Sequence, residues 1–134
     1  MLTILVVDDE LPVRQVLHDV LVDADYHVLV AATAPQALTT LTTVVVDGII
    51  SDVMMPGMSG VDLLATLRAD PRFAALPVVL MSAAPPPATL PLDPQIRFLA
   101  KPWTISQLLD TIAALLIRAS SAGGAPVARA ITAA

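Results

Sequence analysis

The chain has 134 residues, of which 56% are hydrophobic and 3% aromatic, with a formal net charge of −5 and no cysteine. This length fits one domain with a core of its own. The lack of cysteine excludes disulfides, thiolate metal sites and thiol nucleophiles. The negative charge, with no cluster of Lys or Arg, argues against direct binding of nucleic acid. No apolar run reaches the roughly 18 residues of a spanning helix, and the N-terminal residues lack the basic segment and the small-residue cleavage site of a secretory signal, so we expect a soluble, cytoplasmic protein.

Five short apolar runs, most of them rich in β-branched residues, predict strands. They are Thr3–Val7, His27–Ala31, Gly48–Ser51, Val78–Met81 and Ile96–Ala100. Their apolarity is nearly continuous rather than alternating, which indicates a parallel sheet covered on both faces by helices.

Segments of helical period separate the first four runs and follow the last. The first helix has Pro12 in its first turn and the second begins after Thr33 and ends near Thr42, with Pro35 in its first turn. The third follows Gly57–Gly60, and the last opens with a capping box of Thr104 and Gln107. The residues expected to face the core are Val13, Val16, Leu17, Val20 and Leu21 in the first helix, Val61, Leu64 and Leu67 in the third, and Ile105, Leu108, Leu109, Ile112, Leu115 and Leu116 in the last.

The alternation of strands and helices predicts right-handed βαβ units in a doubly wound α/β sheet. Ligands of such folds bind at the carboxyl ends of the strands. Functional residues are therefore expected where the strands end.

One connection departs from this pattern. Residues 84–94 contain five prolines in eleven positions, and each proline inside a helix costs about 3 kcal/mol or more. We expect no regular helix there beyond one turn. Past residue 118 the chain is small and non-periodic, so we divide it into a domain over 1–118 and a flexible tail over 119–134.

Polar residues stand at four strand ends. Asp8 and Asp9 follow the first strand, Asp52 the third, Ser82 the fourth and Lys101 the fifth. Three carboxylates at one edge repel one another unless a cation neutralises them, and oxygen ligands favour Mg²⁺ or Mn²⁺. A lysine and a hydroxyl opposite them suit a phosphoryl group.

Each of these residues alone has an ordinary structural explanation. Asp8 and Asp9 could cap a helix, Asp52 could belong to a turn, Ser82 could bond to the backbone, and Lys101 could be a surface charge. Their occurrence together at four strand ends favours a functional site.

The motifs around these residues resemble receiver domains of bacterial two-component response regulators. They are Val-Val-Asp-Asp-Glu at 6–10, Ser-Asp-Val-Met-Met-Pro-Gly-Met-Ser-Gly at 51–60, Leu-Met-Ser-Ala at 80–83 and Phe-Leu-Ala-Lys-Pro-Trp at 98–103. The match spans about residues 2–118. It implies a flavodoxin-like sheet of five parallel strands in the order 2-1-3-4-5.

The resemblance also implies a role for each matching residue. Asp52 would accept a phosphoryl group from the phosphohistidine of a histidine kinase or phosphotransfer protein. Asp9, Asp52 and the Met54 carbonyl would bind Mg²⁺ directly, and Asp8 would act through water. Lys101 would pair with the carboxylate or phosphoryl oxygens.

Three further residues match the family's switch region. Ser82 would hydrogen-bond the phosphoryl group, Phe98 would turn inward as the Ser82 loop moves, and the Lys101–Pro102 peptide would be cis. Receivers place a fourth helix in the region of residues 84–94, so here we expect that helix to be degraded and the output face to be altered.

The implied protein is a signalling domain rather than an enzyme, catalysing only its own Mg²⁺-dependent phosphorylation and slow dephosphorylation. No output domain follows residue 118, so we expect it to act on a separate protein target. Ala113, Ala114 and Ile117 lie off the main stripe of the last helix and could form a homodimer or partner surface, or could simply be small residues on the surface.

Other protein classes share parts of this pattern. A haloacid-dehalogenase-type phosphatase needs Asp-x-Asp after the first strand, where this chain has Asp-Asp-Glu. A flavodoxin-like FMN carrier needs a phosphate-binding loop there, and the acidic cluster at this position would repel the phosphate of FMN. The Gly-x-Gly-x-x-Gly fingerprint of dinucleotide-binding proteins is absent. A pseudo-receiver used only for protein contacts is the main alternative, and the complete set of site residues argues against it.

Overall fold

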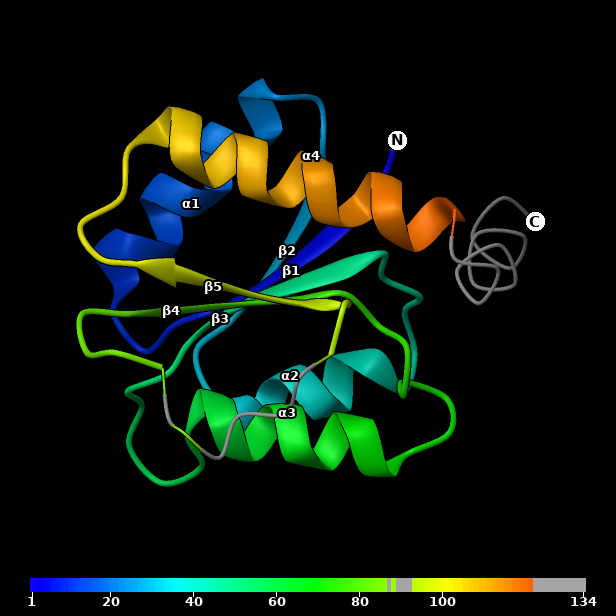
Figure 1. Cartoon of the computed structure of the whole chain (residues 1–134). Helices are drawn as coiled ribbons and strands as arrows, with labels where there is room; N and C mark the ends of the chain where they lie inside the picture. Colours follow the sequence, from blue (N-terminus) through cyan, green and yellow to red (C-terminus); the bar gives the residue numbers. More distant parts are fainter. Residues whose placement is uncertain (87, 89–92, 122–134) are drawn as a thin grey trace.

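The computed structural model describes residues 1–86, 88 and 93–121, which form nine helices and strands (Figure 1). In chain order they are β1 (Thr3–Val7), α1 (Leu11–Asp23), β2 (His27–Ala31), α2 (Ala34–Leu41), β3 (Gly48–Asp52), α3 (Gly60–Ala69), β4 (Val78–Ser82), β5 (Ile96–Ala100) and α4 (Ile105–Ser121). All five predicted strands are present, and β3 and β4 each extend one residue further, to Asp52 and Ser82. Within the described part of the chain, no helix is long and apolar enough to cross a membrane.

The five strands form one parallel sheet in the order β2-β1-β3-β4-β5. This confirms the predicted doubly wound, flavodoxin-like α/β fold. Every residue of β1, β3 and β4 is buried. Their nearly continuous apolar sequence is therefore explained by cover on both faces.

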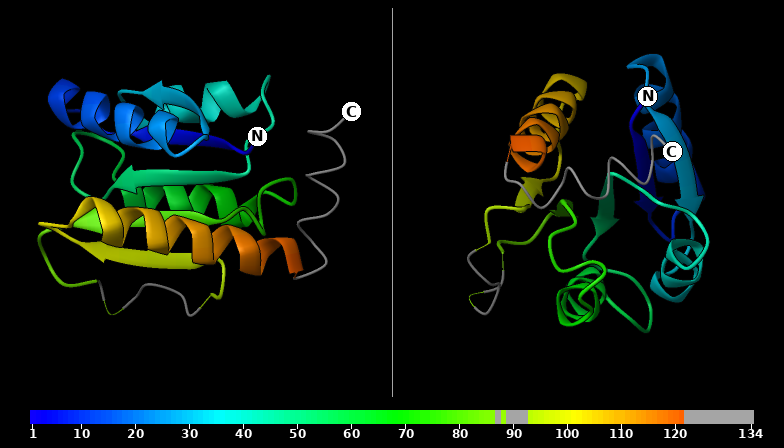
Figure 2. Two further views of the ribbon diagram at one scale, coloured as in Figure 1. Left: turned by 90° about the horizontal axis from the view of Figure 1, so that it is seen from above. Right: turned by 90° about the vertical axis from the view of Figure 1, so that its right-hand side faces the viewer.

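Helices cover both faces of the sheet, with α1 and α4 on one side and α2 and α3 on the other (Figures 1 and 2). Successive side chains of a strand enter opposite layers. Ile49 of β3 lies in the core beneath α2 and α3, whereas the next residue, Ile50, lies in the core beneath α1 and α4.

Side-chain caps fix the starts of three helices. Thr33 accepts a hydrogen bond from the Gln36 N–H and caps α2, as predicted. The predicted capping box of α4 is also present, with Thr104 N donating to Gln107 Oε1 at 2.8 Å and Gln107 N donating to Thr104 Oγ1 at 3.0 Å. A second capping box, which the sequence analysis did not anticipate, joins Ser59 and Asp62 at the start of α3.

Some residues predicted to be buried are not. Val16 is 51% exposed and Ile105 is 55% exposed. Val16 lies about 100° around the helix from Leu17, one of the two buried residues of α1, so it falls outside a narrow buried stripe. Ile105 is the first residue of α4 and precedes its first buried position, Leu108.

The connection from β4 to β5 contains no helix among its described residues, as its prolines predict. Residues 87 and 89–92 lie outside the described part. Arg68 of α3 holds the far end of the connection, since its Nε donates to Asp93 Oδ2 at 2.7 Å and its Nη1 donates to the Phe73 carbonyl. The predicted boundary at residue 118 falls within α4, and the rest of the predicted tail, 122–134, lies outside the description.

The end of α1 is closed by a Schellman motif. Tyr26 N donates to the Leu21 carbonyl and Asp25 N donates to the Val22 carbonyl, both at 3.0 Å. This geometry places Asp25 in the left-handed region, with φ of 70°. An L-residue there is strained, and its negative charge faces the negative end of the helix dipole.

Replacing Asp25 should therefore stabilise the protein. We expect Asp25→Gly to raise the free energy of unfolding by about 0.5–1 kcal/mol, because glycine adopts positive φ without strain. Asp25→Asn removes only the charge and should give about half of that gain. Urea denaturation of both variants measures the difference, and a loss of stability in Asp25→Gly would contradict this account.

Candidate functional site

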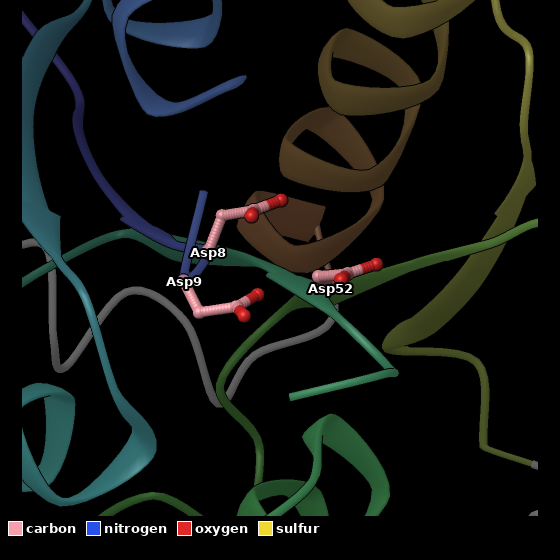
Figure 3. A group of neighbouring side chains, drawn as sticks. All are labelled: Asp8, Asp9 and Asp52. Atoms are coloured by element: carbon pink, nitrogen blue, oxygen red, sulfur yellow. The ribbon is translucent and has the colours of Figure 1, made fainter. Parts of the chain in front are cut away.

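The fold brings the predicted residues to one edge of the sheet. Asp8 and Asp9 directly follow β1, Asp52 is the last residue of β3, Ser82 the last of β4, and Lys101 directly follows β5. Since β1, β3, β4 and β5 are consecutive neighbours, their carboxyl ends lie side by side. Figure 3 shows Asp8, Asp9 and Asp52 grouped at the ends of β1 and β3.

The three aspartates form a compact oxygen cluster. One carboxylate oxygen of each lies within 4.8 Å of the others. Asp8 and Asp52 are buried, whereas Asp9 is exposed. Hard oxygen donors at this spacing suit a small divalent cation such as Mg²⁺ or Mn²⁺.

Asp8 provides a direct test of whether a cation fits. Its Oδ1 accepts a hydrogen bond from Glu10 N at 2.9 Å, whereas its Oδ2 is buried and has no hydrogen-bond partner within the described structure. Burial raises the pKa of the Asp8 carboxyl above its ordinary value of 3.8; the Glu10 hydrogen bond opposes this, the charge of Asp52 adds to it, Lys101 opposes it, and Asp9 adds to it. A cation at the cluster would supply the missing partner of Oδ2.

Lys101 is the counter-charge of Asp52. Its Nζ lies 3.0 Å from Asp52 Oδ1, and the two side chains are 29% and 6% exposed. Lys101 is the only lysine in the chain. The Asp52 backbone is also fixed, because Ser51 Oγ donates to its carbonyl and the adjacent Val53 N donates to the Met81 carbonyl.

Ser82 lies at the end of β4 with its hydroxyl buried. Its Oγ accepts a hydrogen bond from Ala84 N at 3.1 Å, and its carbonyl accepts one from Lys101 N. The hydroxyl proton is not used by the Ala84 contact, so Ser82 can still donate to another oxygen. Ser82 therefore does bond to the backbone, as its ordinary structural explanation predicts, and this bond leaves its hydroxyl proton available for a functional role.

The other predicted site residues are Phe98, Met54 and Pro102. Phe98 is half-buried against the core beneath α2 and α3. The Met54 side chain is 72% exposed, which leaves its carbonyl as the group to consider at the site. The Lys101–Pro102 peptide is cis, as the resemblance implied. Glu10 occupies the N-cap position of α1, but its side chain makes no capping bond.

Two residues that sequence reasoning did not assign also contact the site. Gly60, the first residue of α3, packs against the backbone of Asp52, where an added Cβ would overlap the Asp52 carbonyl oxygen and lie 3.0 Å from Val53 Cα. Arg14 of α1 donates from Nη1 to the Asp8 carbonyl at 2.7 Å. Gly60 was visible within the quoted motif, but nothing in the spacing of Arg14 predicts this bond.

Comparison with known proteins gives the family. Residues 4–113 match the family model of the response regulator receiver domain. The sensory/regulatory protein RpfC of Xanthomonas campestris pv. campestris is 38% identical over 120 residues, and the response regulator Rre1 of Synechocystis sp. is 36% identical over 134. The matches cover 84% and 96% of this chain but 16% of RpfC and 58% of Rre1. The chain therefore belongs to the receiver-domain family of two-component signalling and spans only part of the length of these relatives.

Solved structures agree with this assignment. The chemotaxis protein CheY4 of Vibrio cholerae has a TM-score of 0.77 and 29% identity, covering 86% of this chain and 98% of that one. The response regulator TrrA of Thermotoga maritima, solved in complex with Mg²⁺-BeF, has a TM-score of 0.72 and 25% identity, covering 86% and 99%.

The raised pKa and the buried, unpartnered oxygen of Asp8 predict that its charge opposes folding when no cation is bound. Asp8→Asn keeps the acceptor for Glu10 N, and we expect it to raise the free energy of unfolding by about 1 kcal/mol at pH 7 in EDTA. The folded-state pKa is raised, so the gain is absent below the ordinary value of 3.8, grows as the pH rises from there toward the folded-state pKa, and is constant above it.

Urea denaturation in EDTA between pH 4 and 8 measures this dependence. Asp19→Asn is the matched control, because the Asp19 side chain is 79% exposed and distant from the cluster in the sequence. An Asp8→Asn variant less stable than the wild type at pH 7 would show that the charge of Asp8 is compensated within the protein.

The packing of Gly60 gives a second prediction. Gly60→Ala should lower the free energy of unfolding by about 2 kcal/mol, since the new Cβ must displace α3 from β3. This loss exceeds the gain of about 1 kcal/mol in helix propensity. Gly48→Ala is the control, because its Cβ would meet the movable Leu116 side chain at 3.3 Å and would lie at an ordinary contact distance of 3.6 Å from Ile4 Cδ1 and the Pro77 carbonyl oxygen. Equal stabilities of the two variants would contradict this interpretation.

Proposed function

We propose that this chain is a phosphoacceptor signalling domain in which Asp52 receives a phosphoryl group from a phosphohistidine. A carboxylate oxygen of Asp52 attacks phosphorus, and the P–N bond to the histidine breaks with its electron pair staying on nitrogen. The other ring nitrogen of the phosphohistidine carries a proton, so a neutral imidazole leaves. The observation that carries this proposal is the contact between Asp52 and Lys101 inside a cluster of three carboxylates. A carboxylate held by one lysine beside a cation site is arranged for phosphoryl transfer rather than for stability alone.

Each residue then has a role that its position supports. Asp9, Asp52 and the Met54 carbonyl would hold Mg²⁺ or Mn²⁺, with Asp8 acting through water. The cation supplies positive charge that neutralises the carboxylates and the phosphoryl oxygens. Lys101 would pair with an oxygen of the acyl phosphate, and the free hydroxyl proton of Ser82 would bond another.

The consequence of phosphorylation would be a shift between two states of the chain. Ser82 would draw its loop toward the phosphoryl group, and half-buried Phe98 would turn inward. The chain would act as a cytoplasmic partner of a histidine kinase or phosphotransfer protein and pass the signal to a protein target. It would not be an enzyme beyond its own phosphorylation and dephosphorylation.

Two considerations support this function over a pseudo-receiver that only makes protein contacts. The complete set of Asp8, Asp9, Asp52, Ser82 and Lys101 meets at one edge. In addition, the related TrrA was solved with Mg²⁺-BeF. A domain that only makes protein contacts has no need for three crowded carboxylates, two of them on buried residues.

Intact mass after incubation with acetyl phosphate and Mg²⁺ tests the proposal. We expect the wild type to gain one phosphoryl group that hydroxylamine removes, and Asp52→Asn and EDTA-treated wild type to gain none. Asp19→Asn should behave as the wild type does. No gain in the wild type, with acetyl phosphate and with its kinase, would favour the pseudo-receiver; a gain in Asp52→Asn would mean that the acceptor is another residue.

A further inference from the structure

We infer that Arg14 is a positioning residue for the cation and phosphoryl site, because it fixes the turn that carries Asp8 and Asp9. This inference rests on the proposed function, in that it concerns the binding of a divalent cation by these carboxylates. It adds a residue whose part in the site neither the motifs nor the strand-end positions indicate.

The contacts of Asp8 show what Arg14 does. The Asp8 N–H donates to the Ala31 carbonyl at 3.2 Å, its Oδ1 accepts from Glu10 N at 2.9 Å, and its carbonyl accepts from Arg14 Nη1 at 2.7 Å. Three of its four polar atoms are thus held, and the fourth, Oδ2, is the buried atom without a partner. The Arg14 bond is the shortest of the three and is charge-assisted.

Asp9 depends on the same bond. Its carboxylate makes no hydrogen bond or ion pair within residues 1–86, 88 and 93–121, and the residue is exposed. The direction in which the Asp9 side chain leaves the chain, along its Cα–Cβ bond, is therefore set by the backbone of the turn. The peptide joining Asp8 to Asp9 contains the carbonyl that Arg14 holds, so this guanidinium fixes the plane from which the Asp9 side chain leaves the turn.

Arg14 is well placed for this task. It lies in the first turn of α1, where its own N–H donates to the Glu10 carbonyl at 3.1 Å, and a helical side chain is directed back toward the start of its helix. The side chain is half-buried. It forms no ion pair with any described carboxylate, so it holds the turn without taking the place of the cation.

The sign of its charge makes the inference testable. Arg14 and Mg²⁺ are both positive, so removing Arg14 would tighten Mg²⁺ binding if only electrostatics mattered. Loss of positioning has the opposite effect. Substitution of residues that orient metal ligands typically weakens metal binding by about 10–100-fold.

The experiment compares Arg14→Met with Arg97→Met by Mg²⁺ titration calorimetry on the whole chain. Arg97 also donates only to backbone carbonyls, those of Pro94 and Ile96, at the opposite end of β5. We expect the Mg²⁺ dissociation constant to rise about tenfold in Arg14→Met and to stay within twofold in Arg97→Met. In EDTA, amide exchange at Glu10, whose N–H donates to Asp8 Oδ1, should accelerate in Arg14→Met alone.

Unchanged or tighter Mg²⁺ binding by Arg14→Met would overturn the inference, as would an equal loss in both variants. If the wild type binds no Mg²⁺, the proposed function fails instead, and unaltered amide exchange at Glu10 would still separately refute the positioning role. Should Arg14→Met not fold, Arg14→Lys keeps the charge but replaces the guanidinium with a shorter donor. We then expect a rise of about threefold, and wild-type affinity with wild-type exchange would overturn the inference.

Discussion

The site depends on the crowding of three carboxylates at the ends of neighbouring strands. Like charges at this spacing oppose folding, and the ion pair described within the cluster is the 3.0 Å contact of Lys101 with Asp52. Asp8 remains buried with a free oxygen and a raised pKa, and Asp9 remains exposed. The rest of the domain supplies the rigidity that keeps these charges together, since a flexible edge would let them separate into water.

That rigidity comes from contacts on both sides of Asp52. Gly60 at the start of α3 abuts the Asp52 backbone, and Arg68 in the last turn of the same helix binds Asp93 ahead of β5. The far end of β5 leads into Lys101, which returns to Asp52. Asp52, α3, β5 and Lys101 are therefore linked by a closed series of contacts. Because these contacts are linked, the Arg68–Asp93 ion pair helps to hold α3 and β5, and through them Asp52 and Lys101, in place.

The parts of the structure that sequence could predict follow from periodicity and strand ends. The five strands, the caps at Thr33 and Thr104, and the meeting of Asp8, Asp52 and Lys101 required only local patterns and the rule that parallel strands end together, whereas the strand order came from the resemblance to receiver domains. Burial of Val16 was predicted wrongly because periodicity does not reveal how wide a stripe the sheet covers. The bond from Arg14 to the Asp8 carbonyl was missed because a side chain that binds backbone leaves no partner residue to recognise in the sequence.

The proline-rich connection between β4 and β5 is held by side chains at both of its described ends. Ser82 opens the connection and its hydroxyl accepts the Ala84 N–H, while Asp93 closes it through Arg68. Both ends are thus anchored by side chains that also belong to the frame around Asp52. A regular helix would resist movement of its ends through its own backbone bonds, whereas a segment with five prolines in eleven residues lacks those donors. Under the proposed function, a movement of Ser82 toward a phosphoryl group would start at one anchored end of the connection, and the Arg68–Asp93 ion pair anchors its other end.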